Sequence, residues 1–557
     1  MVSIRKFAIF CHRWMGVVFC LLFSWWFFSG IFMMYWDFPS VREADRLERS
    51  PALDVSKIQV SPQEAWGKLA LDRGPAGVRL ETFDGRPVYR FTAGGGGRGG
   101  RGTGGGGRRP GRGGSAPALV YADDGTVQQA YPNGYPKDML LRIASAWSRQ
   151  PAGAARVEEV TQPDQWTVQS GMRTLRPLWK YTFPDGQQVY ISGASAEVVQ
   201  YTTTASRLGA WLGAIPHWLY FTPLRVQQKL WTNVVIWLSG VGTIMALLGL
   251  IVGISMYSPK GRYRYNGTPT SIPYTGQKRL HMILGLFFGI LTCTWAFSGM
   301  LSMDPPFLTP ARAPGAPGGR GGRSGDNPAA RIQAALGPGR FDFAAYDAKP
   351  PKEALAEIGS AVKELEFTSF DGEPVYMASL GTRETRIVPV NGSPKPEYDS
   401  KRILDMVTAA ALPAVVTEKR LLTQYDAYYL DRHRERPLPI LFVRLNDVEH
   451  SQFYVDQRTG RVVAQHSDTS SFMTRWLYHG LHSMDFPWLY NHRPAWDIIV
   501  LTLMLGGLSL CVTSVIMAWQ LLRRKLDPAL KTHSALTRAS TKEPAAPCTA
   551  RDKPLVL

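Results

Sequence analysis

Cysteine is scarce in this sequence of 557 residues, and it is missing from the longest polar stretches. Segments 37–229 and 304–495 contain no cysteine. Neither segment can therefore be stabilised by an internal disulfide bond, even in an oxidising compartment. The cysteines lie instead in long apolar runs or near the C-terminus, at Cys11, Cys20, Cys293, Cys511 and Cys548.

Carboxylates are almost absent from four apolar runs, which cover residues 7–36, 230–257, 280–303 and 496–522. Each run is long enough to cross a bilayer, which takes about 20 residues. Buried acidic residues would favour a transporter, so their scarcity argues against one. The first run exceeds the apolar core of about 7–15 residues found in secretory signals, and no Ala-x-Ala-like site closes it. We interpret it as a retained membrane anchor.

Basic residues flank the apolar runs on one side of the membrane. They open the first run, fill the loop 258–279 and follow the fourth run, as Arg5, Lys6, Arg13, Lys260, Arg262, Arg264, Lys278, Arg279, Arg523, Arg524 and Lys525. Lys and Arg near spans mark the cytoplasmic side. We therefore expect a protein of the bacterial inner membrane, with both termini, loop 258–279 and tail 523–557 in the cytoplasm, and segments 37–229 and 304–495 in the periplasm.

The formal net charge of +19 is large enough to raise the question of nucleic-acid binding. Much of this charge lies in the cytoplasmic flanks and in two glycine-rich tracts with arginine, 94–114 and 313–327. Such tracts cannot bury enough apolar surface to fold, and the expected topology puts both outside the cytoplasm. We interpret them as flexible insertions and expect no nucleic-acid partner.

The sequence contains an internal repeat. When His12 is aligned with His281, the first and third apolar runs also share Gly16 with Gly285, Trp26 with Trp295, Phe28 with Phe297, and Ser29-Gly30 with Ser298-Gly299. The long segments repeat too, since FDGRPVYRF at 83–91 corresponds to FDGEPVYMA at 370–378. Alternating stretches such as RPVYRF and QVYIS predict strands, and PKDMLLRIASAW predicts a helix. We predict an α-helical membrane protein with four transmembrane helices in two parallel repeats, plus two extracytoplasmic α+β domains.

Four histidines recur at equivalent positions of the two repeats. His12 and His281 lie at matching depth in the first and third spans. His217 and His482 lie in WLGAIPHWLYF and WLYHGLHSMDF, just before the second and fourth spans, and His479 has no counterpart in the first repeat. An ionisable residue within a span suggests function.

Paired imidazoles among apolar and aromatic helices suit b-type haem, whose iron takes two axial ligands. Gly16 and Gly285 would let a planar ring approach the helix backbones. No Cys-x-x-Cys-His occurs, which excludes a c-type haem. We expect two haems b, one held by His12 and His281 and the other by His217 and His482.

Other interpretations of the histidines remain open. His479 is an alternative ligand, a hydrogen-bond partner or a proton donor beside His482. Zinc or copper at His479 and His482 is a further alternative, since residues i and i+3 share a helix face. A histidine at the membrane interface can also be an amphipathic belt residue. We assign no role to the remaining histidines, His433, His450, His466, His492 and His533.

These motifs resemble the PepSY-associated transmembrane proteins, also described as PiuB-like iron-regulated membrane proteins. The resemblance is carried by the H-x-x-x-G span that ends in F-S-G, by D-G-x-P-V-Y and by W-L-x(4)-H, and it covers nearly the whole chain apart from the glycine tracts and the tail. It implies PepSY-like extracytoplasmic domains and a role in iron acquisition, because the group includes inner-membrane ferric-siderophore reductases that carry two haems.

The expected activity is electron transfer across the membrane to a ferric siderophore or another ferric chelate at the periplasmic face. Loop 258–279 and tail 523–557 are too short for a nucleotide-binding domain, which needs at least about 50 residues. The donor must then be a quinol or a separate cytoplasmic protein, and no catalytic residue can be named. The alternative is a PepSY-domain binding or regulatory membrane protein, or a metal-chelate permease, without redox activity.

Overall fold

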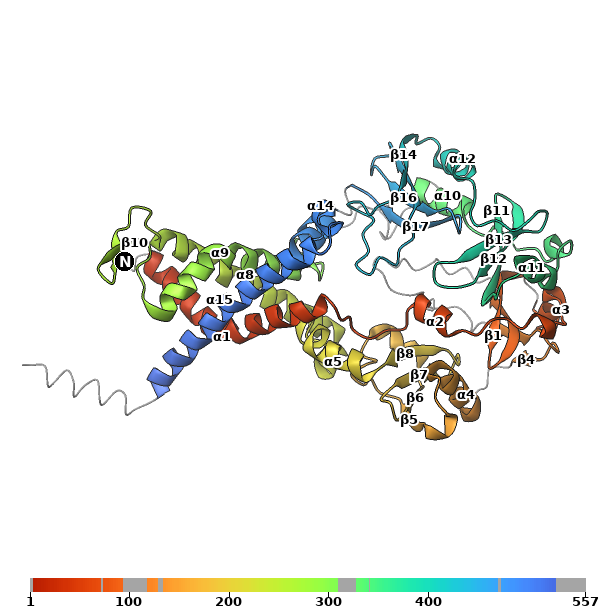
Figure 1. The fold of residues 1–557 in the computed structure, drawn as a ribbon, viewed down its shortest axis with the longest axis horizontal. Coiled ribbons are helices and arrows are strands. Elements are labelled where there is room, and N and C mark those ends of the chain that lie inside the picture. Colours follow the sequence, from red (N-terminus) through yellow and green to blue (C-terminus); the bar gives the residue numbers. More distant parts are fainter. Residues whose placement is uncertain are drawn as a thin grey trace, which may run out of the picture. The chain divides into compact units, whose positions relative to one another are not determined.

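Four long apolar helices are present, as predicted from the sequence. The computed structural model describes residues 4–71, 74–93, 118–128, 134–308, 327–339, 341–468 and 472–526. All four helices have the length and composition of membrane spans: α1 (Ile4–Met33), α8 (Gln228–Met256), α9 (Gly276–Leu301) and α15 (Ala495–Leu526). Figure 1 follows them along the chain. The protein is therefore a membrane protein.

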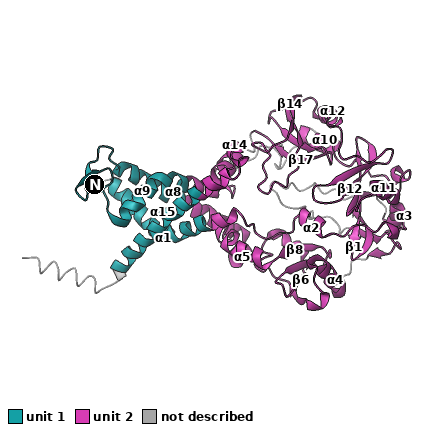
Figure 2. Cartoon of the chain, in the orientation of Figure 1, with its two compact units in different colours: residues 1–28, 241–293, 502–557 teal, residues 29–240, 294–501 magenta. Residues whose placement is uncertain are grey.

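The chain divides into two compact units (Figure 2). The first comprises residues 1–28, 241–293 and 502–557, and therefore contains part of each long helix. Its described core includes Phe19, Cys20 and Phe23 on α1, which are all buried. Its loop between α8 and α9 forms a short hairpin of β9 (Tyr263–Tyr265) and β10 (Thr268–Thr270).

The second unit comprises residues 29–240 and 294–501, and its strands form three antiparallel sheets. The largest sheet has the order β13-β12-β11-β1-β2-β3-β4. Its strands are β1 (Pro75–Phe83), β2 (Arg86–Ala93), β3 (Ala118–Tyr121), β4 (Val127–Gln128), β11 (Glu364–Phe370), β12 (Glu373–Ser379) and β13 (Thr385–Pro389).

This largest sheet differs from the prediction, which gave each long segment a sheet of its own. Strand β1 of the first segment pairs with β11 of the second, and Val78 lies opposite Phe367. The sheet forms because both strands present buried apolar residues to one core, with Leu80 opposite Leu365. Pairing also removes two strand edges that would otherwise be exposed.

The other two sheets each belong to one segment. The first is β5 (Arg156–Val160), β6 (Leu178–Thr182), β7 (Gln188–Ser192) and β8 (Val198–Thr202); the second is β14 (Val416–Leu422), β15 (Ile440–Leu445), β16 (Gln452–Asp456) and β17 (Arg461–His466).

Each of these two sheets carries a predicted amphipathic helix. Helix α4 (Lys137–Ser148) packs with the first sheet, and α12 (Ser400–Ala411) packs with the second. Ile403, Val407 and Ala411 recur every fourth residue on the buried face of α12. The α+β character predicted for the long segments is therefore confirmed.

Shorter helices complete the second unit. They are α2 (Glu43–Arg49), η1 (Val55–Lys57), α3 (Pro62–Gly67), η2 (Ala152–Ala154), η3 (Ser170–Leu175), α5 (Thr204–Leu212), α6 (Ala214–His217), α7 (Thr222–Arg225), α10 (Pro328–Ala335), η4 (Ala344–Tyr346), α11 (Pro351–Ile358), η5 (Met473–Gly480), α13 (Leu481–Ser483) and α14 (Pro487–Tyr490). The tracts 94–114 and 313–326 lie outside the described residues, and Asn327 caps α10.

A buried ionic network crosses the junction between β1 and β11. Glu81 accepts from Arg90 Nε at 2.5 Å and pairs with Arg79 Nε at 2.8 Å, while Glu364 pairs with Arg79 and with Arg46 of α2. Burial alone would raise the pKa of the Glu81 carboxyl, but Arg90 and Arg79 bring that pKa down to about 2. The Glu81 carboxylate therefore stays charged at neutral pH inside the shared sheet.

Candidate functional site

The first pair of predicted histidines meets inside the first unit. The ring centres of His12 in α1 and His281 in α9 lie 6.3 Å apart, with 35° between their planes. The Nδ1 atom of His12 lies 3.0 Å from the main-chain oxygen of Met245 in α8, and Nδ1 of His281 lies 3.0 Å from Oγ1 of Thr513 in α15. Each ring is thus oriented by a second helix.

These hydrogen bonds determine which ring nitrogen carries the proton. A carbonyl oxygen can only accept, so Nδ1 of His12 donates to Met245 and the lone pair stays on Nε2. The Thr513 hydroxyl already donates its hydrogen to the Leu510 carbonyl oxygen at 2.6 Å, so it accepts from Nδ1 of His281. Both neutral imidazoles therefore keep Nε2 available as a metal ligand.

The second pair meets inside the second unit. The ring centres of His217 in α6 and His482 in α13 lie 6.0 Å apart, with 71° between their planes. Nδ1 of His217 lies 3.1 Å from Oγ of Ser29, and Nδ1 of His482 lies 3.1 Å from Oγ of Ser298. Both serines are fully buried. They are the aligned serines of the two F-S-G motifs, so both rings have the same kind of partner.

His482 is neutral at physiological pH. Its burial, followed by the nearby His217 ring, lowers the pKa of His482 to about 3. The Ser298 hydroxyl donates to the Trp295 carbonyl oxygen at 3.1 Å, so it accepts from Nδ1 of His482 and leaves Nε2 with a lone pair. A neutral imidazole is the form that coordinates a metal.

His479 has a different environment from His482, although only three residues separate them. Its Nδ1 lies 3.7 Å from Oδ2 of Asp485, whose other carboxylate oxygen accepts from Arg475 at 2.8 Å. The Tyr478 ring lies near both histidines, with ring-centre distances of 4.9 Å to His479 and 5.4 Å to His482. The structure therefore places His482 opposite His217 and His479 beside a carboxylate.

A π-helix separates the environments of these two histidines. Segment η5 (Met473–Gly480) has π-helical hydrogen bonds, and His479 lies in its last turn. The wider turn changes the relation between residues three apart, which on an α-helix would share one face. No group of three or more His, Cys, Asp or Glu side chains in the described parts of the chain is arranged to hold a metal ion. The geometry thus gives no support to zinc or copper at His479 and His482.

The separations within both pairs fit two imidazoles on one iron. A bond between a metal and an imidazole nitrogen is about 2.0 Å, and a ring with bonds of about 1.35 Å has its centre about 1.1 Å from each nitrogen. Imidazoles on opposite sides of one ion therefore have centres about 6.2 Å apart. The observed 6.3 and 6.0 Å agree with this value.

Glycines leave room beside the first pair. A Cβ at half-buried Gly16 would meet no atom within 4 Å, and one at Gly285 would reach only Leu510 Cδ1 at 3.8 Å. Gly249 of α8 has the opposite relation to the ring, since a Cβ there would lie 2.5 Å from Cε1 of His12. The absence of side chains at Gly16 and Gly285 thus leaves space one turn from each ring, as a macrocycle held by His12 and His281 would need.

Sequence reasoning missed the residues that orient the four rings. Ser29 and Ser298 were visible as a repeated F-S-G, but nothing in the sequence connected them to histidines nearly 200 positions away. Met245 and Thr513 carry no motif, because a main-chain carbonyl or one hydroxyl in a span is common. Such partners become visible only when helices are packed.

The unassigned histidines have other neighbours. His433 Nε2 pairs with Asp37 at 2.6 Å, and His492 Nδ1 contacts the Trp488 carbonyl oxygen. His466 lies against the rings of Tyr428 and Tyr454, and His450 is exposed. His533 lies outside the described residues.

Comparison with known proteins gives a family. A comparison with curated proteins gives no match. A family model described as the PepSY-associated TM region matches the chain twice, over residues 10–357 and 278–543. Together these matches span all four long helices, both long segments and both histidine pairs. The chain therefore belongs to the PepSY-associated transmembrane family.

Proposed function

We propose that this protein is a haem-containing electron-transfer protein that reduces a ferric siderophore or another ferric chelate for iron acquisition. Two haems b would be held, one by His12 and His281 and one by His217 and His482. The observation that carries the proposal is the pairing itself: two sets of neighbouring imidazoles, with ring centres 6.3 and 6.0 Å apart, whose Nδ1 atoms are all engaged by other groups.

The protein's own residues bind and orient. His12, His281, His217 and His482 would each offer Nε2 to the iron, and the hydrogen-bond partners of Nδ1 hold the rings in place. When bound, haem with two imidazole ligands supplies a one-electron couple and has no open position for oxygen. The four rings are half-buried, and the apolar helices around them limit the access of water, which favours electron transfer over side reactions.

His479 has a separate place in this proposal. Its ring is partly exposed, next to Asp485, and the Tyr478 ring lies close to both His479 and His482. It is positioned to accept or release a proton beside the second pair rather than to ligate iron. In this topology, the second pair serves the periplasmic side of a bacterial inner membrane, both termini face the cytoplasm, and the donor is a quinol or a cytoplasmic reductase.

The decisive experiment is a dithionite-reduced minus oxidised visible spectrum of the purified protein, with haem quantified per chain. Two haems per chain with sharp low-spin bands are expected for the parent. His281→Ala and His482→Ala should each lose about one haem, because each removes one of two axial ligands. His492→Ala is the matched control, since it removes an exposed imidazole outside both pairs and should retain both haems.

A folded preparation from haem-replete cells that contains no haem would overturn the redox function. It would favour the non-redox alternative, a PepSY-domain binding protein or chelate permease. Loss of both haems in His492→Ala as well would show that haem content reports general folding, and would remove the support for individual ligands.

A further inference from the structure

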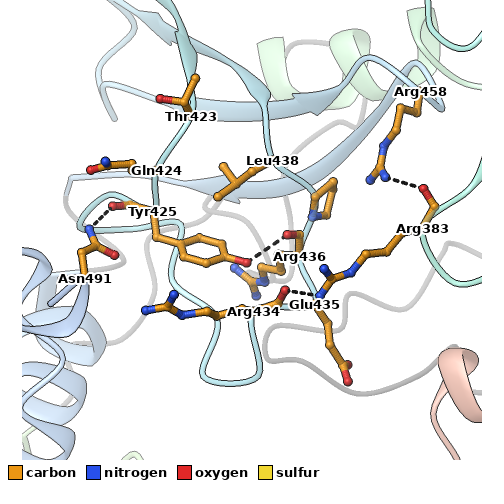
Figure 3. Close-up of a pocket in the computed structure, with 11 residues that line it drawn as sticks. Arg383, Thr423, Gln424, Tyr425, Arg434, Glu435, Arg436, Leu438, Arg458 and Asn491 are labelled. Carbon is orange, nitrogen blue, oxygen red and sulfur yellow. Dashed lines mark hydrogen bonds between the residues drawn. The ribbon is translucent and has the colours of Figure 1, made fainter. Parts of the chain in front are cut away.

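The second unit contains an arginine-lined cavity that the histidine pairs do not explain (Figure 3). Its volume is about 340 Å³, within the size range of small-molecule sites. Four guanidiniums line it together with a single carboxylate: Arg383, Arg434, Arg436, Arg458 and Glu435. The loop that supplies three of these residues reads DRHRERP at 431–437.

The positive charge of the cavity is only partly compensated. Glu435 is held by Arg42 at 2.5 Å, and Arg458 pairs with Asp456 at 3.2 Å. In the described part of the chain, no ion pair with a carboxylate is found for Arg383, Arg434 or Arg436. Uncompensated guanidiniums around one cavity attract an anion, and their planar fork suits the oxygens of carboxylates and phosphates.

Hydrogen bonds hold the wall of the cavity in place. The Arg383 guanidinium donates to the Arg434 carbonyl oxygen at 2.7 Å, and Arg458 donates to the Arg383 carbonyl oxygen at 2.9 Å. The Tyr425 hydroxyl donates to the Arg436 carbonyl oxygen at 3.0 Å, and Asn491 donates to the Tyr425 carbonyl oxygen. Figure 3 shows these links around the arginines. A wall fixed in this way lowers the entropy cost of binding.

The loop is also fixed at its base. The Asp431 carboxylate accepts from the main-chain amides of Glu435 at 2.6 Å and Arg436 at 2.8 Å. His433 and Arg432 reach Asp37, which follows α1. The arginines are therefore presented by a turn with internal support on both sides.

Arg436 of the cavity wall also acts on two histidines of the second unit, His466 and His479. Burial, followed by the Arg436 guanidinium, lowers the pKa of His466 to about 4. Burial also lowers the pKa of His479, against Asp485, and both Arg475 and Arg436 contribute to that lowering. The positive charge of Arg436 therefore disfavours protonation of both imidazoles.

We infer that this cavity binds a polycarboxylate anion, and that the ferric chelate reduced by the protein is of this anionic class. The second half of the inference rests on the proposed function, whereas anion binding itself does not. A cationic or neutral chelate would gain nothing from three unpaired guanidiniums, whereas several carboxylates on one small molecule can each engage one.

The test is isothermal titration calorimetry on the full chain in detergent at low ionic strength. The probes are citrate, ferric citrate, inorganic phosphate and a cationic ferric trihydroxamate. Citrate and ferric citrate should bind, and Arg434→Gln or Arg436→Gln should weaken their binding about tenfold or more, because each removes a charged hydrogen-bond donor. Arg173→Gln is the matched control, since this exposed arginine lies in η3 outside the cavity and should leave binding unchanged.

Absence of citrate and ferric citrate binding to the parent would overturn the inference, as would equal loss in Arg173→Gln. Phosphate that binds as tightly as citrate would overturn the polycarboxylate assignment. Preference for the cationic chelate would overturn the anionic class. Haem quantified in the same samples separates the two proposals: two haems without citrate binding leaves the redox function standing, and citrate binding without haem supports the anion site while overturning its role in reduction.

Discussion

The Ser298 hydroxyl accepts a hydrogen bond from Nδ1 of His482 at 3.1 Å while it donates its own hydrogen to the Trp295 carbonyl oxygen. The serine is completely buried in α9, so no water can replace it. This relationship fixes one tautomer of a histidine that belongs to a different element. Ser298 is therefore the residue that positions the His482 ring.

Ser298→Ala should therefore weaken the second haem site and leave the first intact. Loss of a group that orients a ligating histidine typically costs about 10–100-fold in affinity. The measurement is haem retained per chain during dilution, together with the redox midpoint of each haem. Ser302→Ala is the control, because the Ser302 hydroxyl, just after the end of α9, donates to the Gly299 carbonyl oxygen. If both variants retained haem equally, Ser298 would not be the residue that positions His482.

Gly249→Ala should displace His12 and reduce haem at the first site by about one per chain. The new Cβ would lie 2.5 Å from Cε1 of His12, closer than atoms of this kind approach. Gly253→Ala, one turn later on α8, would place its Cβ 3.5 Å from Leu286 and should be tolerated. Visible spectra of both purified variants check this. An unchanged spectrum in Gly249→Ala would show that the first site does not depend on the close approach of α8 to the ring.

His479→Ala should retain both haems, whereas His482→Ala loses one. His479 lies beside Asp485, and His482 lies beside His217, so on the proposed function only the second substitution removes an axial ligand. Loss of a haem in His479→Ala with retention in His482→Ala would reverse the assignment. The rate of chelate reduction in His479→Ala, measured against pH, then reports on its role as a proton donor.

The buried Glu81 predicts acid sensitivity of the second unit. The pKa of Glu81 lies near 2 in the folded protein, below the ordinary value of 4.5. The charged carboxylate therefore contributes its full stabilisation at pH values above 4.5. The contribution, about 3 kcal/mol, is lost as pH falls from 4.5 towards 2. Circular dichroism of urea unfolding across this pH range measures it.

Glu81→Gln should flatten that pH dependence and destabilise the protein at neutral pH, because Arg90 is left buried without its partner. Glu158→Gln is the control, since Glu158 pairs with Lys180 at a largely exposed site. A parental slope preserved in Glu81→Gln would show that other carboxylates cause the acid sensitivity.

The pairing of β1 with β11 can be tested by cross-linking. Arg79 lies opposite Glu366, and opposed residues of antiparallel strands have Cα atoms within the range that a disulfide can bridge. Arg79→Cys combined with Glu366→Cys should form a disulfide on mild oxidation, seen as a mobility shift that reductant reverses. Arg79→Cys combined with Glu373→Cys should not. The long segments contain no cysteine of their own, so a disulfide within them can form only between the two introduced cysteines.

The long helices and the two histidine pairs could be predicted because their signals are local. An apolar run about 20 residues long predicts a membrane span. Alignment of the two repeats placed His12 opposite His281 and His217 opposite His482. The shared sheet could not be predicted, because the strand pattern of β11 is equally compatible with several pairing partners. The environment of His479 could not be predicted either, because it depends on the π-helix η5. No residue pattern in WLYHGLH predicts such an irregular turn.

The arginine cavity was missed for another reason. The run of basic residues at 432–436 resembles any solvated charged loop. The loop becomes one wall of a cavity because Arg383 and Arg458, from elsewhere in the second unit, lie beside it. Charged residues from distant strands and loops come together only when the chain packs. Their proximity therefore cannot be predicted from one sequence.

Both histidine pairs impose an order on biogenesis. His12 and His217 are synthesised before residue 257, whereas their partners His281 and His482 come after residue 276. The first half of the nascent chain therefore carries single imidazoles only. Neither pair can therefore form until the histidine contributed by the second repeat has been synthesised and inserted. On the proposed function, the site at His12 and His281 can be completed once α9 is inserted, whereas the site at His217 and His482 has to wait for residues near the end of the chain.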